Sequence, residues 1–521
     1  MKNASRQRIE INVDQLDRVL DEARQAPLSD DDYQLLKTTL HAMADRLRPA
    51  QRSEKMSELF GEQKPSPSES VEAQSVGQKP DKPAGHGRNG AEAFSGARQV
   101  RVAHQKLNHG DRCPECGRGH VYEQNKPRVF VRIVGQAPVA ATVYSLERLR
   151  CNACGQIFTA QAPEGVEEEK YDATAAAMIA QMKYGSGMPF HRLERLEENM
   201  GIPLPAATQW EIAKGAANVA RPAHEELIRQ AAQGEVLHND DTSMRVLHLA
   251  RAPDDERTGV FTSGIVSIAE GRRIALFFTG RQHAGENIAD VLKRRAAQLP
   301  APVQMCDGSS SNTSAYPEGV KILLANCLAH GRRQFVEIMA NFPSQCRFVL
   351  EQLGSVYHND ALARRGKMPA EERLRFHQEH SGPIMEALHA WMMAQLDEHR
   401  VEPNSGLGHA FLYMHNRWPA LTLFLRQLGA PLDNTLVERA LKKAILHRKN
   451  ALYYKTENGA HVGDLFMSLI HTCELNGVPS LGYLIALQKH ARAVAEQPAD
   501  WMPWNYRDTL HPTDLARTSE L

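Results

Sequence analysis

The stretch VLHND, residues 236–240, decides the fold, because the periodicity of the chain changes there from helical to strand-like. Three more stretches of the strand type follow it: RVLHLAR (245–251), GVFTSGIVSI (259–268) and RIALFFTG (273–280). The order is completed by a helical pattern at 284–299, a strand at PVQMCD (302–307), and a strand that runs into a helix at 321–340.

Antiparallel-type strands, then a helix and a further strand, predict an α/β protein with a ribonuclease-H-like core. In that fold, carboxylates at the ends of the first and fourth strands meet at one edge of the sheet. Asp240 ends VLHND and Asp307 ends PVQMCD, so both stand at such positions. Paired Mg²⁺ ions prefer hard carboxylate oxygens of this kind.

A third carboxylate would have to come from a helix packed beside the strands. In DNTLVERALKKAILHRKN, residues 433–450, Glu438 occupies the first turns of a predicted helix. Spacing alone leaves two other interpretations open. Acidic residues at strand ends are usually surface residues, and Thr435 with Glu438 also matches a helix capping box.

Two C-x-x-C-G motifs, at Cys113–Cys116 and Cys151–Cys154, lie upstream of this core. Four thiolates from two such knuckles predict one tetrahedral structural Zn²⁺ in a zinc-ribbon-like module. Redox activity is the rival interpretation for a single C-x-x-C motif, but not for two with matching glycines. Residues 101–154 hold nine Lys/Arg against four acidic residues, which favours DNA contact by a chain whose net charge is zero.

The N-terminal segment, residues 9–48, shows two short amphipathic patterns, which predict a helical hairpin or a coiled-coil seam for self-association. A stretch at 61–98, rich in Pro, Gly, Ser and Lys, predicts a flexible linker. Residues 172–231 are predicted to be helical, with the rhythm of a helix-turn-helix around Gln209 and Trp210. A packed helical bridge between domains is an equally acceptable interpretation.

From about residue 84 to 505 the sequence resembles the insertion-sequence-66 family of bacterial transposases, which carry an Asp-Asp-Glu site. The blocks HNDDTSMRVL, MCDGSSSNTSAY, CLAHGRRQF and LDNTLVERALKKAILHRKNALYY occur in the family's order, followed by SLIHTCELNGVPSLGYL. The ending WMPWNY is similar to the family's Pro-Trp tail, and the cysteine pairs match its zinc-binding region. Three positions depart from the family pattern: Asp241, Thr435 and His447.

The resemblance implies a catalytic triad of Asp240, Asp307 and Glu438 that binds two Mg²⁺ ions, with Mn²⁺ as a substitute. It implies cleavage of DNA at the ends of an insertion sequence, followed by transfer of the freed 3′-hydroxyl to a target phosphodiester. Contacts to DNA phosphates are expected from six basic residues: His330, Arg332, Arg333, Lys442, Arg448 and Lys449. A solvated basic helix face is the alternative for these six.

Two other functions stay open at this point: a catalytically inactive DNA-binding protein derived from a transposase, and a structure-specific nuclease. The expected partners are double-stranded DNA, further copies of the chain, and small accessory proteins of the same element. The start of the chain has no apolar stretch typical of a signal peptide, and no run of about 18 apolar residues predicts a membrane span. We therefore expect a cytoplasmic, nucleoid-associated protein.

Together, these patterns and motifs predict eight regions along the chain. They are an N-terminal helical or coiled-coil segment (1–60), a flexible linker (61–98), a zinc-binding module (99–165), a helical DNA-binding or bridging region (166–232), the first part of the ribonuclease-H-like core (233–340), a helical insertion (341–430), the core helix with the catalytic Glu (431–472) and a C-terminal tail (473–521).

Overall fold

The computed structural model describes residues 103, 105–122, 137–150, 152, 154, 156–164, 166, 169–250, 257–313, 316 and 319–510. Of the described residues, those in 103–335 and 351–510 belong to one compact unit, and 336–350 belong to a second. The expected N-terminal helices and linker lie outside the described residues, as do Cys151 and the 126–135 part of the expected zinc module.

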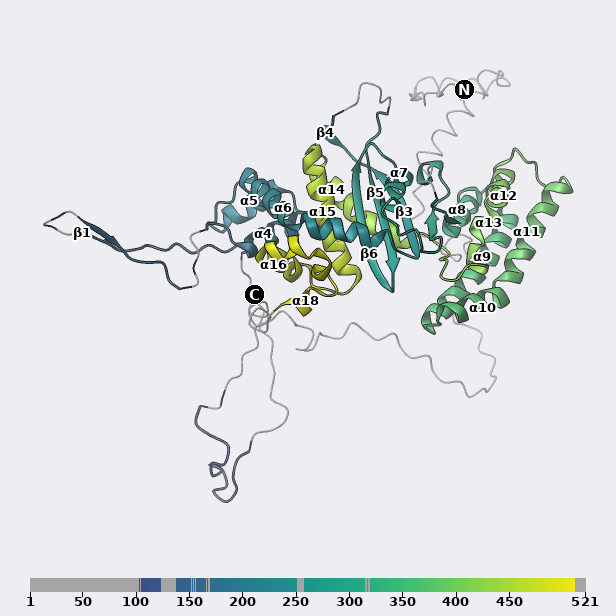
Figure 1. Cartoon of the computed structure of the whole chain (residues 1–521). Coiled ribbons are helices and arrows are strands. Elements are labelled where there is room, and N and C mark those ends of the chain that lie inside the picture. The colour runs from purple at the N-terminus through teal and green to yellow at the C-terminus, as the bar shows by residue number, and fades with distance from the viewer. Residues whose placement is uncertain are drawn as a thin grey trace, which may run out of the picture. The chain divides into compact units, whose positions relative to one another are not determined.

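A five-stranded mixed sheet is the centre of the larger unit (Figure 1). Its strand order is β6-β5-β3-β7-β8. The neighbours β6, β5 and β3 are antiparallel, whereas β3, β7 and β8 run parallel. The strands span Val236–Ser243 (β3), Phe261–Ala269 (β5), Arg272–Gly280 (β6), Val303–Cys306 (β7) and Leu323–Asn326 (β8). The protein is therefore a mixed α/β protein.

One predicted strand does not join this sheet. The stretch 245–251 contributes only β4, Val246–His248, and β4 pairs with β9, Tyr454–Thr456, in a separate two-stranded sheet. The pairing partner lies far along the chain, so local periodicity could not reveal it. The sequence-based expectation that 245–251 continues the series of core strands was wrong.

Helix α15, Glu457–Leu475, closes the outer edge of the sheet at β6. Backbone N–H groups of alternate β6 residues donate to side chains one helical turn apart on α15. The pairs are Ala275 with Thr472 at 3.0 Å, Phe277 with Ser468 at 3.0 Å, and Thr279 with Asp464 at 2.7 Å. These bonds satisfy donors that an open strand edge would expose.

Two helices cover opposite faces of the sheet centre. Helix α14, Thr435–Ala451, packs on β3 and β5 over the face that carries Asp240 and Gly264. Helix α7, Ala284–Leu292, packs on the other face, where Asn287 donates to the hydroxyl of Ser263 at 2.9 Å. The two faces therefore place neighbouring residues of β3 in different surroundings.

The helical region before the sheet consists of α4 (Ala173–Ala180), a π-helical turn (Gln181–Gly185), α5 (Phe190–Asn199) and α6 (Ala206–Ala231). The side chain of Gln209 donates to the carbonyls of Phe190 and Leu204, and Trp210 packs against the core. These contacts use the polar group of Gln209 inside the protein, which favours a packed bridge over a DNA-reading helix for this region.

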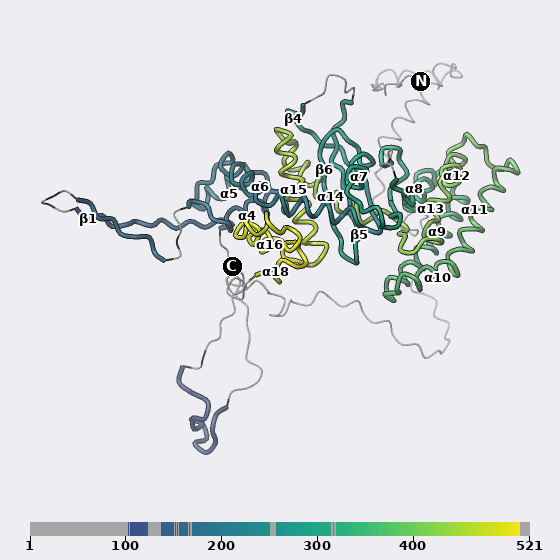
Figure 2. Tube along the Cα trace, in the orientation of Figure 1, coloured from purple at the N-terminus to yellow at the C-terminus, as the bar shows by residue number. Residues whose placement is uncertain are grey.

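The helices between β8 and α14 run in series, as Figure 2 traces. Their bounds are Leu328–Ile338 (α8), Pro343–Arg365 (α9), Ala370–His380 (α10), Gly382–Asp397 (α11), Gly406–Asn416 (α12) and Trp418–Leu421 (α13). After α15 the chain forms α16 (Ser480–Lys489), α17 (Ala491–Glu496) and α18 (Tyr506–Thr509). Within the described ranges, none of the helices combines the length and apolar character needed to cross a membrane.

Candidate active site

Two strands, and the residues that directly follow two more, bring four side-chain positions to one end of the sheet. Gly264 of β5 pairs directly with Asp240 of β3. Continuing the β3–β7 register by two residues sets Asp240 level with Asp307, and continuing the β7–β8 register by one sets Asp307 level with Cys327. Residues at one level of neighbouring strands point to the same face. We call Gly264, Asp240, Asp307 and Cys327 the site row.

The surroundings of Asp240 disfavour its charged form. Burial raises the pKa of Asp240 to about 6, and the negative charges of Asp307 and Asp241 also raise it. Hydrogen bonds from the Asp241 backbone and the Asn312 side chain lower the pKa in part. The contribution of Asp307 means that the two aspartates interact, as two carboxylates do when no cation lies between them.

Asn312 connects the two aspartates of the row. Its side-chain amide donates to Oδ1 of Asp307 at 2.7 Å, and it also hydrogen-bonds Asp240. The backbone N–H of Ser309 donates to the same Asp307 oxygen at 2.7 Å. Because Asn312 is buried, it fixes the orientation of both carboxylates. Sequence reasoning missed Asn312, although it lies in the MCDGSSSNTSAY block.

Helix α14 lies close to the row because Gly264 has no side chain. A Cβ on Gly264 would lie 2.9 Å from Cδ2 of Leu441 and 3.2 Å from Cγ2 of Val437. At the start of the helix, Oδ1 of Asn434 accepts a hydrogen bond from Nδ1 of His238 at 3.1 Å, and Nδ2 of Asn434 donates to the Asn239 carbonyl at 3.0 Å. These contacts hold the first turn of α14 above the site row.

Glu438 projects from that first turn and lies at the Cys327 end of the row. Its Oε1 is 3.8 Å from Nδ1 of His330, and ligand atoms of Glu438, His330 and Cys327 all lie within 4.8 Å of one another. The capping-box alternative is wrong, because Asn434 and not Thr435 is the N-cap residue, and its side chain makes no capping hydrogen bond. Thr435 is the first residue of the helix instead.

Asp241 faces the other side of the sheet. Its Oδ2 is 2.7 Å from Nδ1 of His283, the residue that caps α7. Successive residues of a strand point to opposite faces, so Asp240 and Asp241 have separate surroundings.

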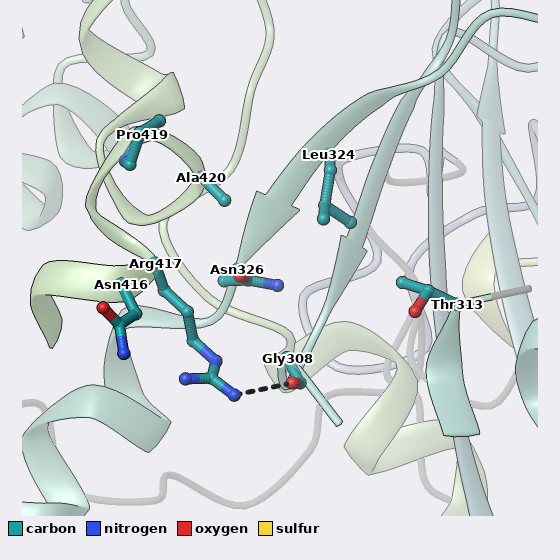
Figure 3. A pocket seen from close by; sticks show the side chains of 8 residues that line it. All are labelled: Gly308, Thr313, Leu324, Asn326, Asn416, Arg417, Pro419 and Ala420. Carbon is teal, nitrogen blue, oxygen red and sulfur yellow. Dashed lines mark hydrogen bonds between the residues drawn. The ribbon is translucent and has the colours of Figure 1, made fainter. Parts of the chain in front are cut away.

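A polar hollow of about 510 Å³ opens beside the Asp307 turn. Figure 3 shows Arg417 reaching across it to Gly308, with Asn326 and Asn416 nearby. The Arg417 guanidinium donates to the Gly308 carbonyl at 3.3 Å and stacks over the ring of Tyr413 at 4.2 Å. Neither Tyr413 nor Arg417 was singled out from the sequence, since both lie within the helical insertion.

The six basic residues expected to contact DNA differ in their surroundings. Arg333, Lys442 and Lys449 are exposed, and His330, Arg332 and Arg448 are half-buried. The Arg448 guanidinium donates to the hydroxyl groups of Thr242 at 3.1 Å and Ser243 at 2.7 Å. Arg448 therefore ties the end of α14 to the end of β3, whereas Lys442 and Lys449 are free to face solvent.

The first cysteine knuckle adopts a tight turn. The N–H of Gly117 donates to the Cys113 carbonyl at 2.9 Å, and Gly117 has a φ of +61°, which glycine adopts without steric cost. Backbone hydrogen bonds from Gly119 and Arg118 lower the pKa of the Cys116 thiol. Near the second knuckle, β1 (Arg148–Arg150) pairs with β2 (Ile157–Thr159) in an antiparallel hairpin.

The fold and the site define a mixed α/β protein with two interacting aspartates and a helix-borne glutamate on one face of the sheet. The chain belongs to the IS66 family of transposases. The family model described as "Transposase IS66 family" matches residues 169–462. That match covers the sheet, the helical insertion, α14 and part of α15.

The chain is also similar to proteins of Sinorhizobium fredii (strain NBRC 101917 / NGR234). The uncharacterized protein y4jD is 24% identical over 372 residues, which is 69% of this chain and 71% of that protein. The uncharacterized protein y4hP is 24% identical over 382 residues, covering 69% and 67% respectively. The uncharacterized protein y4qI is 27% identical over 357 residues, covering 64% and 62%.

Proposed function

We propose that the chain binds the ends of an insertion sequence and catalyses metal-dependent strand cleavage and strand transfer during transposition. Asp240, Asp307 and Glu438 would be the catalytic carboxylates. One observation carries the proposal: Asp240 of β3 and Asp307, which directly follows the adjacent parallel strand β7, interact electrostatically beside the helix of Glu438. Membership of a transposase family supports the same conclusion.

The core of this enzyme would be ribonuclease-H-like. The order β6-β5-β3-β7-β8, with three antiparallel strands followed by two parallel ones, supports this assignment. So does the position of the acidic residues, because Asp240 lies on the central strand β3 and Asp307 directly follows its neighbour β7. The helices between β8 and α14 would then be an insertion into the core.

The donor set fits hard divalent cations such as Mg²⁺ or Mn²⁺. Asp240 and Asp307 offer carboxylate oxygens, and burial and mutual repulsion raise the pKa of Asp240 to about 6. A cation between the two carboxylates would relieve this repulsion. Bound metal ions in such sites supply charge stabilisation for the attacking and leaving oxygens of an in-line displacement.

The protein side chains would hold and orient these reactants. Asn312 keeps the Asp307 carboxylate in place, and Asp240 and Glu438 approach from the strand and the helix. Exposed cations, among them Arg333, Lys442 and Lys449, would contact DNA phosphates. The attacking groups are water and then a DNA 3′-hydroxyl, so no side chain acts as a nucleophile.

The cysteine module would bind one structural Zn²⁺ through Cys113, Cys116, Cys151 and Cys154. The turn at Gly117 and the lowered pKa of the Cys116 thiol support this assignment, because a cysteine binds a metal ion as a thiolate. The module would strengthen DNA binding. Assembly of copies of the chain on two element ends, with accessory proteins of the same element, belongs to the same proposal, as does association with the nucleoid in the cytoplasm.

Cleavage of labelled element-end DNA by purified protein in Mg²⁺ tests the proposal. Asp240→Asn, Asp307→Asn and Glu438→Gln keep side-chain shape but remove a charged ligand. Each should abolish cleavage and joining while DNA binding persists, because binding depends on the basic residues. Asp241→Asn is the matched control, since Asp241 faces His283 on the other side of the sheet.

Three results would contradict the proposal. DNA binding without any cleavage by the unmodified chain would favour a binding protein derived from a transposase. Cleavage that follows DNA shape rather than the element-end sequence would favour a structure-specific nuclease. Full cleavage by Asp240→Asn or Asp307→Asn would exclude these aspartates as catalytic residues.

A further inference from the structure

We propose that Cys327, His330 and Glu438 form a second cation site, selective for thiophilic divalent ions such as Zn²⁺ and Co²⁺. This site is distinct from the carboxylate pair and from the cysteine knuckles. Its occupation would withdraw Glu438 from the aspartates and stop catalysis, a consequence that rests on the function proposed above.

The three ligand atoms are already close together. A thiol, an imidazole nitrogen and a carboxylate oxygen lie within 4.8 Å of one another. The neighbouring ligand atoms of a tetrahedral zinc ion, bound at about 2.0–2.3 Å, are separated by roughly 3–4 Å. Small side-chain movements would therefore complete the coordination.

Local structure directs two of these ligands toward the third. Cys327 lies between β8, which ends at Asn326, and α8, which begins at Leu328, so His330 follows it by three residues in the first turn of that helix. The N–H of Asn434 donates to the Cys327 sulfur at 3.2 Å, which ties this ligand to the start of the Glu438 helix. Within the described part of the chain, the buried Nδ1 of His330 makes no hydrogen bond, and it lies 3.8 Å from Glu438.

The chemistry of the set determines which ion it selects. Mg²⁺ takes oxygen ligands and avoids sulfur, whereas Zn²⁺ and Co²⁺ accept thiolate, imidazole and carboxylate together. The side chain of Glu438 is 35% exposed and that of His330 is 22% exposed, whereas Cys327 is buried. An ion could therefore enter from solvent and keep a water molecule as its fourth ligand.

Glu438 would belong to two competing ligand sets. Cys327 is level with Asp307 in the site row, so the thiophilic site lies directly beside the carboxylate pair. A carboxylate held by a zinc ion at the Cys327 end cannot at the same time complete a magnesium site at the Asp240 end. The competition would make the enzyme sensitive to free zinc even in excess magnesium.

Cobalt binding by the full chain tests the site without any need for activity. The unmodified protein should bind one more Co²⁺ per chain than Cys327→Ser, measured by elemental analysis after dialysis. The difference spectrum should show a sulfur-to-cobalt charge-transfer band and the visible bands of four-coordinate cobalt. Cys473→Ser removes another buried free thiol and should bind as much cobalt as the unmodified protein.

His330→Gln provides a second variant should Cys327→Ser fail to fold, and it should also lose the extra cobalt. Equal cobalt binding by the unmodified chain and both variants would overturn the proposal. Inhibition is a separate measurement: Cys327→Ser should need at least about ten-fold more Zn²⁺ for half-inhibition of Mg²⁺-dependent cleavage. Absence of cleavage in the unmodified chain would contradict the proposed function, while the cobalt result would still decide the site.

Discussion

The hydroxyl of Tyr413 donates a hydrogen bond to the backbone carbonyl of Asp307 at 3.0 Å. Arg417, one helical turn further on, stacks over the same ring and donates to the carbonyl of Gly308. Gly308 has a φ of +83°, and a Cβ there would lie 2.9 Å from Nε of Arg417. The end of α12 thus holds the turn that follows Asp307.

Tyr413→Phe should weaken the site without removing any charged group. The phenyl ring keeps its packing under Arg417, but the bond to Asp307 is lost, at a cost of about 1 kcal/mol. If that free energy serves to position Asp307, the rate of cleavage should fall about five-fold. Single-turnover cleavage and thermal unfolding measure the two effects. Tyr453→Phe, at an exposed position, is the control and should change neither.

Gly264→Ala should displace the helix that carries Glu438. The added methyl group would lie about 3 Å from the side chains of Leu441 and Val437, so α14 must shift or strain. We expect a loss of about 1–3 kcal/mol in the free energy of unfolding, together with a marked loss of cleavage. Gly280→Ala, which adds a methyl group where nothing lies within 4 Å, is the matched control. Equal stability of the two variants would contradict the role given to Gly264.

The sequence predicts the end of β7 directly before Asp307, because the short strand PVQMC leads into it. It places the end of the first strand wrongly, because β3 continues past Asp240 to Ser243 through polar residues that carry no apolar strand signal. The sequence does not predict the position of Glu438 above the sheet. That position depends on Gly264, and a missing side chain leaves no periodic signal. The contacts of Tyr413 and the cluster around Cys327 join segments far apart in the chain, and local patterns carry no information about such contacts. Strand β4 was misplaced for the same reason, because its partner β9 follows α14.

Stability should depend on pH through Asp240. The pKa of Asp240 rises from 3.8 to about 6 on folding, so the folded state favours its protonated form. The resulting contribution to the free energy of unfolding is fully present below about pH 4 and is lost as the pH rises through about 6. Without added metal, Asp240→Asn should therefore be more stable than the unmodified protein above pH 6, by at most about 3 kcal/mol. Near pH 4 the two should agree.

Denaturant titrations across this pH range measure the difference. Mg²⁺ or Mn²⁺ should stabilise the unmodified protein above pH 6 and lose this effect at lower pH, because protonation of Asp240 competes with the cation. If Asp240→Asn is less stable than the unmodified protein at pH 7 without added metal, burial does not penalise the charge of Asp240.

Purified protein should contain one tightly bound Zn²⁺ per chain, held by the two cysteine knuckles. The double variant Cys113→Ser, Cys151→Ser removes one thiolate from each knuckle and should lose this ion. Elemental analysis measures zinc, and electrophoretic mobility shift on element-end DNA measures the effect on binding. Full zinc retention by the double variant would exclude the knuckles as the site.

The hydrogen bonds between β6 and α15 require that the axial rise of the helix match the rise of the strand. Four residues of helix rise about 6 Å and two residues of strand rise about 6.6 Å, so a donor on every second strand residue meets an acceptor on every fourth helix residue. Inserting one residue between Asp464 and Thr472 would rotate the next acceptor by about 100° away from the strand. The length of α15 between Asp464 and Thr472 is therefore set by the strand that it covers, and a one-residue insertion there should break the hydrogen bonds that close this edge of the sheet.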